Sequence, residues 1–180
     1  ISQTSATYYH QLMQYNRLLQ QRNAVLKEYR GKNTIPLEEW DLQLADMASF
    51  IVKKRLESLK KINLLIDLMN RKLTGGLENL TIGYEQPYMD NGSLEYTKEG
   101  FYERIKAALP QDRHRLSTSV GPHRDDLRFF SDAMDLKKFG SQGQQRTAVL
   151  SLKLSELEFI KSEVGEYPVL LLDDVLSELD

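Results

Sequence analysis

The chain has 180 residues, of which 41% are hydrophobic and 28% charged, a balance typical of a globular protein with a sizeable core. It contains no run of about 18 apolar residues, so we expect no membrane-spanning helix, and its start, ISQTSATYYHQ, lacks the basic and apolar segments of a secretory signal. The absence of cysteine excludes disulfides and thiolate metal sites and fits a cytoplasmic protein.

The charge is distributed unevenly along the chain. Residues 1–75 carry 12 Lys and Arg against 7 Asp and Glu, a balance of +5, whereas the rest carry 12 against 19, a balance of −7. The basic half could approach nucleic acid or another acidic partner. A solvated helical face rich in lysine would give the same excess, and such faces are common.

Two long helices are predicted first, over residues 5–29 and 37–73. Both segments repeat apolar residues at steps of three and four, as amphipathic helices do. Gly31 stands where the first helix would stop and Pro36 where the second would start. Because the connection is short, we expect the two helices to pack as an antiparallel hairpin.

Shorter elements are predicted beyond Gly75 and Gly76. Turn signals at 90–92 and around Gly121 and Pro122 separate segments rich in β-branched and aromatic residues. Strands are predicted over 80–85, 94–99, both sides of the turn in 117–130, and 167–174; helices are predicted over 101–109, ending at Pro110, and over about 142–164.

The last predicted strand, YPVLLLDD, is a continuous apolar run typical of a strand buried on both faces. It ends in Asp173 and Asp174, at the edge of a sheet where open α/β folds bind ligands. Neighbouring strand residues point to opposite faces, so one carboxylate could hold Mg²⁺ while the other polarises a water. Alternatively, Asp174 begins a turn or caps a helix.

The helix predicted from about 142 starts with the sequence Ser141, Gln142, Gly143, Gln144. Ser141 and Gln144 fit a capping box, which satisfies helix amides without any ligand. Gly143, however, lies in the first turn, where glycine costs up to about 1 kcal/mol relative to alanine. That cost is understandable if a ligand must approach the backbone closely, and a serine hydroxyl with free amides at a helix start suits a phosphate.

The order of these motifs resembles the ABC-type ATPases: a serine-glycine-glutamine helix start, an apolar strand ending in acids, then LSELD. The segments ISQTSATYYHQLMQYNRLLQQRN, SVGPHRDDL, GSQGQQRT and LLLDDVLSELD most resemble the RecF family of bacterial recombination-repair proteins, and the resemblance covers essentially the whole chain. It implies that Ser141, Gln142, Gly143 and Gln144 are the signature that contacts the γ-phosphate of ATP on the opposite protomer.

The same resemblance assigns roles to the end of the chain. Asp173 corresponds to the carboxylate that supports Mg²⁺, and Asp174 to the catalytic base. Ser177 and Asp180 correspond to the loop that crosses the dimer interface and helps to bind ATP. The family implies an ATP-dependent homodimer that binds DNA where duplex meets single strand and loads recombination machinery, with RecR and RecO as partners.

The sequence lacks the P-loop, GxxxxGK[ST], that such ATPases need. Its one GK pair, Gly31 and Lys32, is followed by Asn33. We therefore expect an internal fragment of α/β class that does not hydrolyse ATP alone: a helical arm domain over 1–110, and over 111–180 part of an ABC-type head.

Two further features leave alternatives open. A basic surface on the second helix is predicted to contact DNA or a partner, and it comprises Lys53, Lys54, Arg55, Lys60 and Lys61. In GPHRDDL, a turn at Gly121 and Pro122 is favoured over a metal site at His123. The chain could instead be a helical module that docks a repair partner without nucleotide; an SMC-type protein is disfavoured because its arms run to hundreds of residues.

Overall fold

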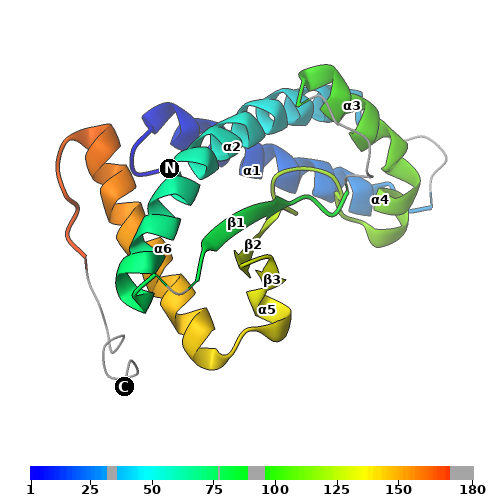
Figure 1. Cartoon of the computed structure of the whole chain (residues 1–180). Coiled ribbons are helices and arrows are strands. Elements are labelled where there is room, and N and C mark those ends of the chain that lie inside the picture. Colours follow the sequence, from blue (N-terminus) through cyan, green and yellow to red (C-terminus); the bar gives the residue numbers. More distant parts are fainter. Residues whose placement is uncertain (32–35, 77, 89–95, 171–180) are drawn as a thin grey trace. The chain divides into compact units, whose positions relative to one another are not determined.

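The computed structural model describes residues 1–31, 36–76, 78–88 and 96–170, and these are mostly helical with a small sheet (Figure 1). The chain divides into two compact units that alternate along the sequence. Unit 1 comprises Ile1–Leu56 and Glu85–Asp126, and unit 2 comprises Glu57–Tyr84 and Leu127–Asp180. The predicted arm (1–110) and head part (111–180) remain a prediction about the intact protein.

The two long helices form as predicted. Helix α1 spans Ala6–Glu28 and begins at the N-cap Ser5, whose hydroxyl accepts from the Tyr8 amide. Helix α2 spans Glu38–Thr74 and carries acidic residues in its first turn and basic residues in its last, in agreement with the helix dipole. None of the helices in the described parts of the chain combines the length and apolarity that a membrane span requires.

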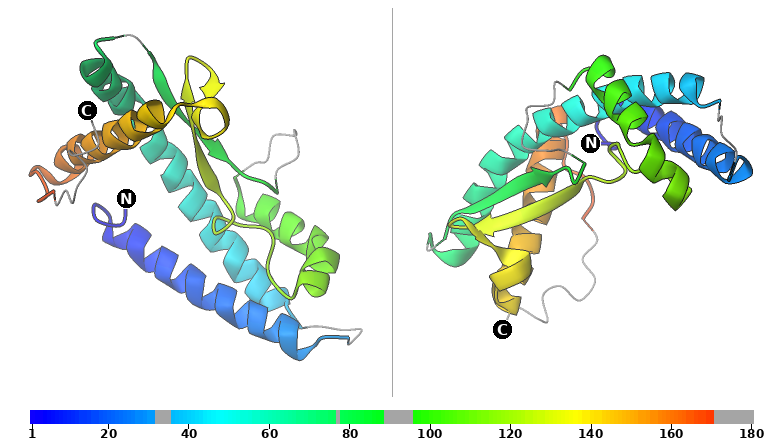
Figure 2. Two further views of the ribbon diagram at one scale, coloured as in Figure 1. Left: turned by 90° about the horizontal axis from the view of Figure 1, so that it is seen from below. Right: turned by 90° about the vertical axis from the view of Figure 1, so that its right-hand side faces the viewer.

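Helix α1 and the first half of α2 form the predicted antiparallel hairpin (Figure 2). Arg22, late in α1, contacts Asp41 in the first turn of α2, and Tyr8, early in α1, contacts Arg55, so the two helices run in opposite directions. Helix α1 has 23 residues against 37 for α2, so it covers only part of its neighbour. Ile66, in the second half of α2, belongs to the apolar core of unit 2 instead.

Unit 1 is completed by helices α3 (Lys98–Ala107) and α4 (Leu109–Arg115). The predicted strand over 94–99 is wrong where it can be compared, since the Thr97 hydroxyl accepts from the Gly100 amide and caps α3. Pro110 does follow the end of α3, and it lies in the first turn of α4. The turn signal at 90–92 lies outside the described residues.

Nearly all of the sheet belongs to unit 2; its strands are β1 (Leu80–Glu85), β2 (Asp126–Ser131) and β3 (Met134–Asp135), in the order β1-β2-β3. Strands β2 and β3 pair antiparallel, with Ser131 opposite Met134. After the one-turn helix α5 (Leu136–Phe139), helix α6 runs over Gln142–Val164, as predicted. Its Ala148 shares a core with Leu80 and Ile82 of β1.

Two further strand predictions are not confirmed. Of the predicted strand, turn and strand over 117–130, the turn and the second strand form, but 117–120 is no strand, because the amides of Thr118 and Ser119 donate to the side chains of Asn23 and Asp112 instead of to a neighbouring strand. Residues 167–170 are assigned no strand, and Val169 is 89% exposed. A strand buried on both faces needs partners, and none of the described strands pairs with this segment. The rest of that prediction, 171–174, lies outside the described residues.

Candidate functional site

The predicted signature stands at the start of α6 in unit 2. Ser141 is the N-cap: its hydroxyl accepts from the Gln144 amide at 3.2 Å, and the Gln144 side-chain oxygen accepts from the Ser141 amide at 3.0 Å. This confirms the predicted capping box. Gly140 precedes it in an extended conformation, and a Cβ built there would lie 2.6 Å from the Leu136 carbonyl oxygen, so glycine is required at this position.

The free polar groups of the signature point to what it can bind. Ser141, Gln142 and Gly143 are exposed, and the first two amides of a helix have no intrahelical acceptor. The Ser141 hydroxyl accepts one hydrogen bond and keeps its own hydrogen available as a donor. A hydroxyl and two free amides at the positive end of a 23-residue helix suit an oxyanion.

Gly143 is not required by the packing of this chain. Among the described residues, a Cβ built there meets only the Ser141 hydroxyl, at 3.9 Å, which is an ordinary contact. An alanine would therefore fit and would favour the helix. The absence of a side chain keeps the first turn of α6 open to an approaching group.

A glutamate that the sequence pattern did not reveal holds this helix start in place. The Gln144 side-chain nitrogen donates to Glu78 Oε1 at 2.8 Å, and the Ser131 hydroxyl donates to Glu78 Oε2 at 2.7 Å. Both carboxylate oxygens thus join the signature to the end of β2. Gly143, Gln144 and Glu78 also line a cavity of about 230 Å³.

The second half of the predicted site cannot be compared with the structure. Asp173, Asp174, Ser177 and Asp180 lie outside the described residues. Within the described parts of the chain, no group of three or more His, Cys, Asp or Glu side chains could hold a metal ion. The predicted roles of these four residues remain predictions from the family resemblance.

The predicted basic surface of α2 divides into two kinds of residue. Lys53, Lys54, Lys60 and Lys61 are exposed, and Lys61 Nζ lies 2.5 Å from Glu163. Arg55 instead bonds to other residues of unit 1. Its guanidinium donates to the Tyr8 hydroxyl at 3.0 Å and to the Pro122 carbonyl at 2.6 Å.

The GPHRDD segment forms the predicted turn. The Arg124 amide donates to the Gly121 carbonyl at 2.9 Å, and Gly121 has a φ of +132°. A Cβ on Gly121 would lie 2.2 Å from the Tyr15 hydroxyl, so only glycine fits here. The turn thereby packs directly on α1.

His123 fixes the turn through both ring nitrogens. Its Nε2 lies 3.0 Å from the Thr118 carbonyl, which can only accept, so Nε2 carries the hydrogen and Nδ1 accepts from the Tyr15 hydroxyl at 2.7 Å. Burial lowers the pKa of His123 and raises that of Tyr15. Both side chains are therefore neutral near pH 7.

A buried arginine organises the rest of unit 1. Arg22 is fully buried, donates to Asp41 at 2.6 Å and Asp112 at 2.7 Å, and also reaches the Thr118 hydroxyl at 2.9 Å. Burial raises the pKa of Asp41, and the Arg22 charge opposes that shift. Arg22 and Asp112 lie 90 positions apart, and no pattern in the sequence links them.

Comparisons with known proteins agree on one group of relatives. No protein-family model matches the chain. It is 49% identical over 182 residues to the DNA replication and repair protein RecF of Alkaliphilus oremlandii, and 47% identical over 186 residues to that of Halothermothrix orenii. Each match includes 100% of this chain and 50% of the relative, so the chain spans about half the length of these proteins.

Solved structures give the same result. The chain matches a structure of the recombination mediator protein RecF with ATPrS, from the RecFOR pathway, with a TM-score of 0.88 and 38% identity. A structure of RecF with ATP matches with a TM-score of 0.86. Both matches cover 98% of this chain and 48% of the solved one.

Proposed function

Because the chain is a RecF homologue along its whole length, we propose that it is the arm and the signature-bearing part of a RecF-type, ATP-dependent DNA-binding protein of recombination and replication. The intact protein works in the cytoplasm, dimerises when it binds ATP, and loads recombination machinery at gaps in DNA. RecR and RecO are the proposed protein partners. The RecFOR pathway named for the solved relatives supports this assignment.

The helix start at Ser141 is the proposed sensor of ATP. Its exposed hydroxyl and the free amides of Gln142 and Gly143 would donate to the γ-phosphate of ATP held by the P-loop of the other protomer. Glu78 fixes the Gln144 side chain, so the donors are held in place before ATP arrives. A dimer would thus form only when ATP is bound, because each ATP site needs residues from both protomers.

The residues outside the described ranges are assigned by resemblance. Asp173 would support Mg²⁺, which balances the phosphate charge, and Asp174 would take the proton of the attacking water. Ser177 and Asp180 would lie across the dimer interface. This chain, which lacks a P-loop, is proposed to be inactive as an ATPase by itself.

DNA is the proposed partner of the lysines on α2. Lys53 and Lys54 are exposed on the part of α2 that belongs to unit 1, and Lys60 and Lys61 on the part that belongs to unit 2. Lysines make contacts to phosphates without reading sequence, so binding would weaken steeply with salt. We exclude Arg55 from this contact, because its guanidinium is held by Tyr8 and Pro122.

The observation that carries the proposal is the capped, open helix start in a chain homologous to RecF throughout. Its test is calorimetric titration of Mg-ATP into the 180-residue chain and into a form extended to include a P-loop. We expect heat of binding only from the extended form. Binding by the short chain, or robust Mg²⁺-dependent hydrolysis by it, would contradict the proposal. Tight binding of RecR or RecO by the short chain, with no nucleotide effect in the extended form, would favour a docking module.

A further inference from the structure

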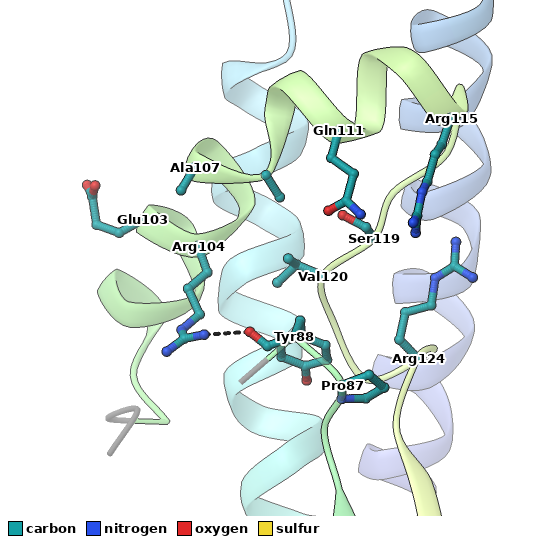
Figure 3. A pocket seen from close by; sticks show the side chains of 11 residues that line it. Pro87, Tyr88, Glu103, Arg104, Ala107, Gln111, Arg115, Ser119, Val120 and Arg124 are labelled. Carbon is teal, nitrogen blue, oxygen red and sulfur yellow. Dashed lines mark hydrogen bonds between the residues drawn. The ribbon is translucent and has the colours of Figure 1, made fainter. Parts of the chain in front are cut away.

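Unit 1 contains a larger cavity, of about 870 Å³, that has no part in the proposed ATP contact. Its walls come from α3, α4, the segment after β1 and the turn region before β2 (Figure 3). Three arginines line it, Arg104 from α3, Arg115 from α4 and Arg124 from the turn region. In Figure 3, the guanidinium groups of Arg115 and Arg124 point toward one another.

None of these three arginines has a carboxylate partner among the described residues. Arg104 donates to the Tyr88 carbonyl at 2.5 Å, and the Nε and Nη2 atoms of Arg124 donate to the Thr118 carbonyl at 3.1 and 2.9 Å. Carbonyl oxygens position a guanidinium but leave its positive charge unbalanced.

Arg115 is bound still more weakly. With the Gln111 amide oriented to satisfy it, the amide oxygen accepts from Arg115 Nη1 at 3.2 Å and Nη2 at 3.1 Å. Elsewhere in the chain, Arg22 and Arg71 each have an aspartate within hydrogen-bond distance. The cavity therefore contains three arginines that are held by carbonyl or amide oxygens and that no carboxylate of the described residues pairs with.

We propose that this cavity binds an acidic peptide segment of a partner protein, one that combines carboxylates with an apolar side chain. Guanidinium groups bind carboxylates in two-pronged hydrogen bonds, and arginine clusters are a recurring receptor for acidic motifs. Val120 and Pro87 provide apolar wall for the non-polar side chain. A volume of about 870 Å³ lies within the range of roughly 300–1,000 Å³ for small-ligand sites and suits a few residues of extended chain.

A peptide fits the cavity better than a nucleic acid does. Glu103 belongs to the cavity lining, but its side chain points away from Arg115 and Arg124 (Figure 3), so it does not oppose a carboxylate bound there. Duplex DNA is too wide to enter a cavity of this size. Single-stranded DNA remains the competing ligand that the test must exclude.

Fluorescence anisotropy of the 180-residue chain tests the proposal, with a fluorescein-labelled peptide of three aspartates alternating with three leucines as the probe. We expect binding that an asparagine-for-aspartate peptide does not reproduce. Arg115→Glu should weaken it about tenfold or more, the scale of one lost charge-assisted contact. Arg115 is the suitable target because its one described partner is the Gln111 side chain.

Arg17→Glu is the matched control, since Arg17 is also exposed in unit 1 but lies on α1 outside the cavity. We expect it to bind the probe like the unchanged chain, and circular dichroism should show both variants folded. Equal weakening by the two variants would mean non-specific attraction and would overturn the proposal. Absence of probe binding would also overturn it. The proposal would likewise fail if a labelled oligo-dT displaced the probe and Arg115→Glu weakened the binding of that oligo-dT.

Discussion

Two glycines at the start of α6, three positions apart, should respond to alanine in opposite ways. At Gly143 the new methyl group meets one atom of the described residues, the Ser141 hydroxyl oxygen at 3.9 Å, so no described atom has to move. Glycine destabilises a helix interior by about 1 kcal/mol relative to alanine, and by less in the first turn, so alanine removes up to that amount. Gly143→Ala should therefore leave the melting temperature unchanged or raise it by roughly 2–4 °C.

At Gly140 the same methyl group would lie 2.6 Å from the Leu136 carbonyl oxygen and 3.0 Å from its Cα. Backbone must shift to relieve these contacts, so Gly140→Ala should cost about 1–3 kcal/mol. Thermal and urea unfolding of the two variants, followed by circular dichroism, measures both effects. Marked destabilisation by Gly143→Ala, or equal effects of the two substitutions, would refute the geometry of this helix start.

The remaining predictions concern the support of the site, the turn region and the lysine surface. Glu78→Ala should lower the free energy of unfolding in urea by about 1–3 kcal/mol, because it removes two charge-assisted hydrogen bonds. Glu78→Gln should lower it less, since glutamine can accept from Gln144 and donate to Ser131. Equal losses in the two variants would contradict this pairing. Because the pKa of His123 is lowered below its ordinary 6.5, the unfolded chain binds more protons, so stability should fall as the pH drops below about 6.5, by at most about 1.4 kcal/mol per pH unit. That slope should flatten in His123→Gln and persist in His10→Gln, whose ring is exposed; an unchanged slope in the first variant would refute the assignment. Charge reversal at Lys53, Lys54 and Lys60 of α2 should weaken DNA binding by the intact protein. The slope of log affinity against log salt concentration should fall by roughly three, one for each lost phosphate contact. Unchanged binding would show that these lysines do not contact DNA.

The helices were the part of the fold that sequence could predict. Apolar periodicity predicted α1 and α2 to within one residue at each end, and α6 was predicted at its observed bounds from the capping box at Ser141, both members of which lie within four residues. Local patterns of this kind carry their own physical explanation. The strand at 80–85 was also predicted at its observed bounds.

Three of the misses share a physical cause, which is that partners distant in sequence decide the local contacts. Thr118 and its neighbours have strand-like composition, yet their amides bond to side chains of α1 and α4. Glu78 lies 66 residues from Gln144, and no pattern in the sequence links them. Arg55 was grouped with the lysines beside it, because a composition count does not show that Pro122 and Tyr8 hold its guanidinium.

The central claim is that this chain senses ATP held by another protomer, and a mixing experiment tests it most directly. Two forms of the intact protein are needed, one with its P-loop lysine replaced and one with Ser141→Arg, and each should fail to dimerise on ATP and to hydrolyse it. When they are mixed, one of the two composite sites contains an intact P-loop and an intact signature. We predict that mixing restores ATP-dependent dimers and part of the hydrolysis; if mixing restores neither, the signature does not act across the dimer and the account is wrong.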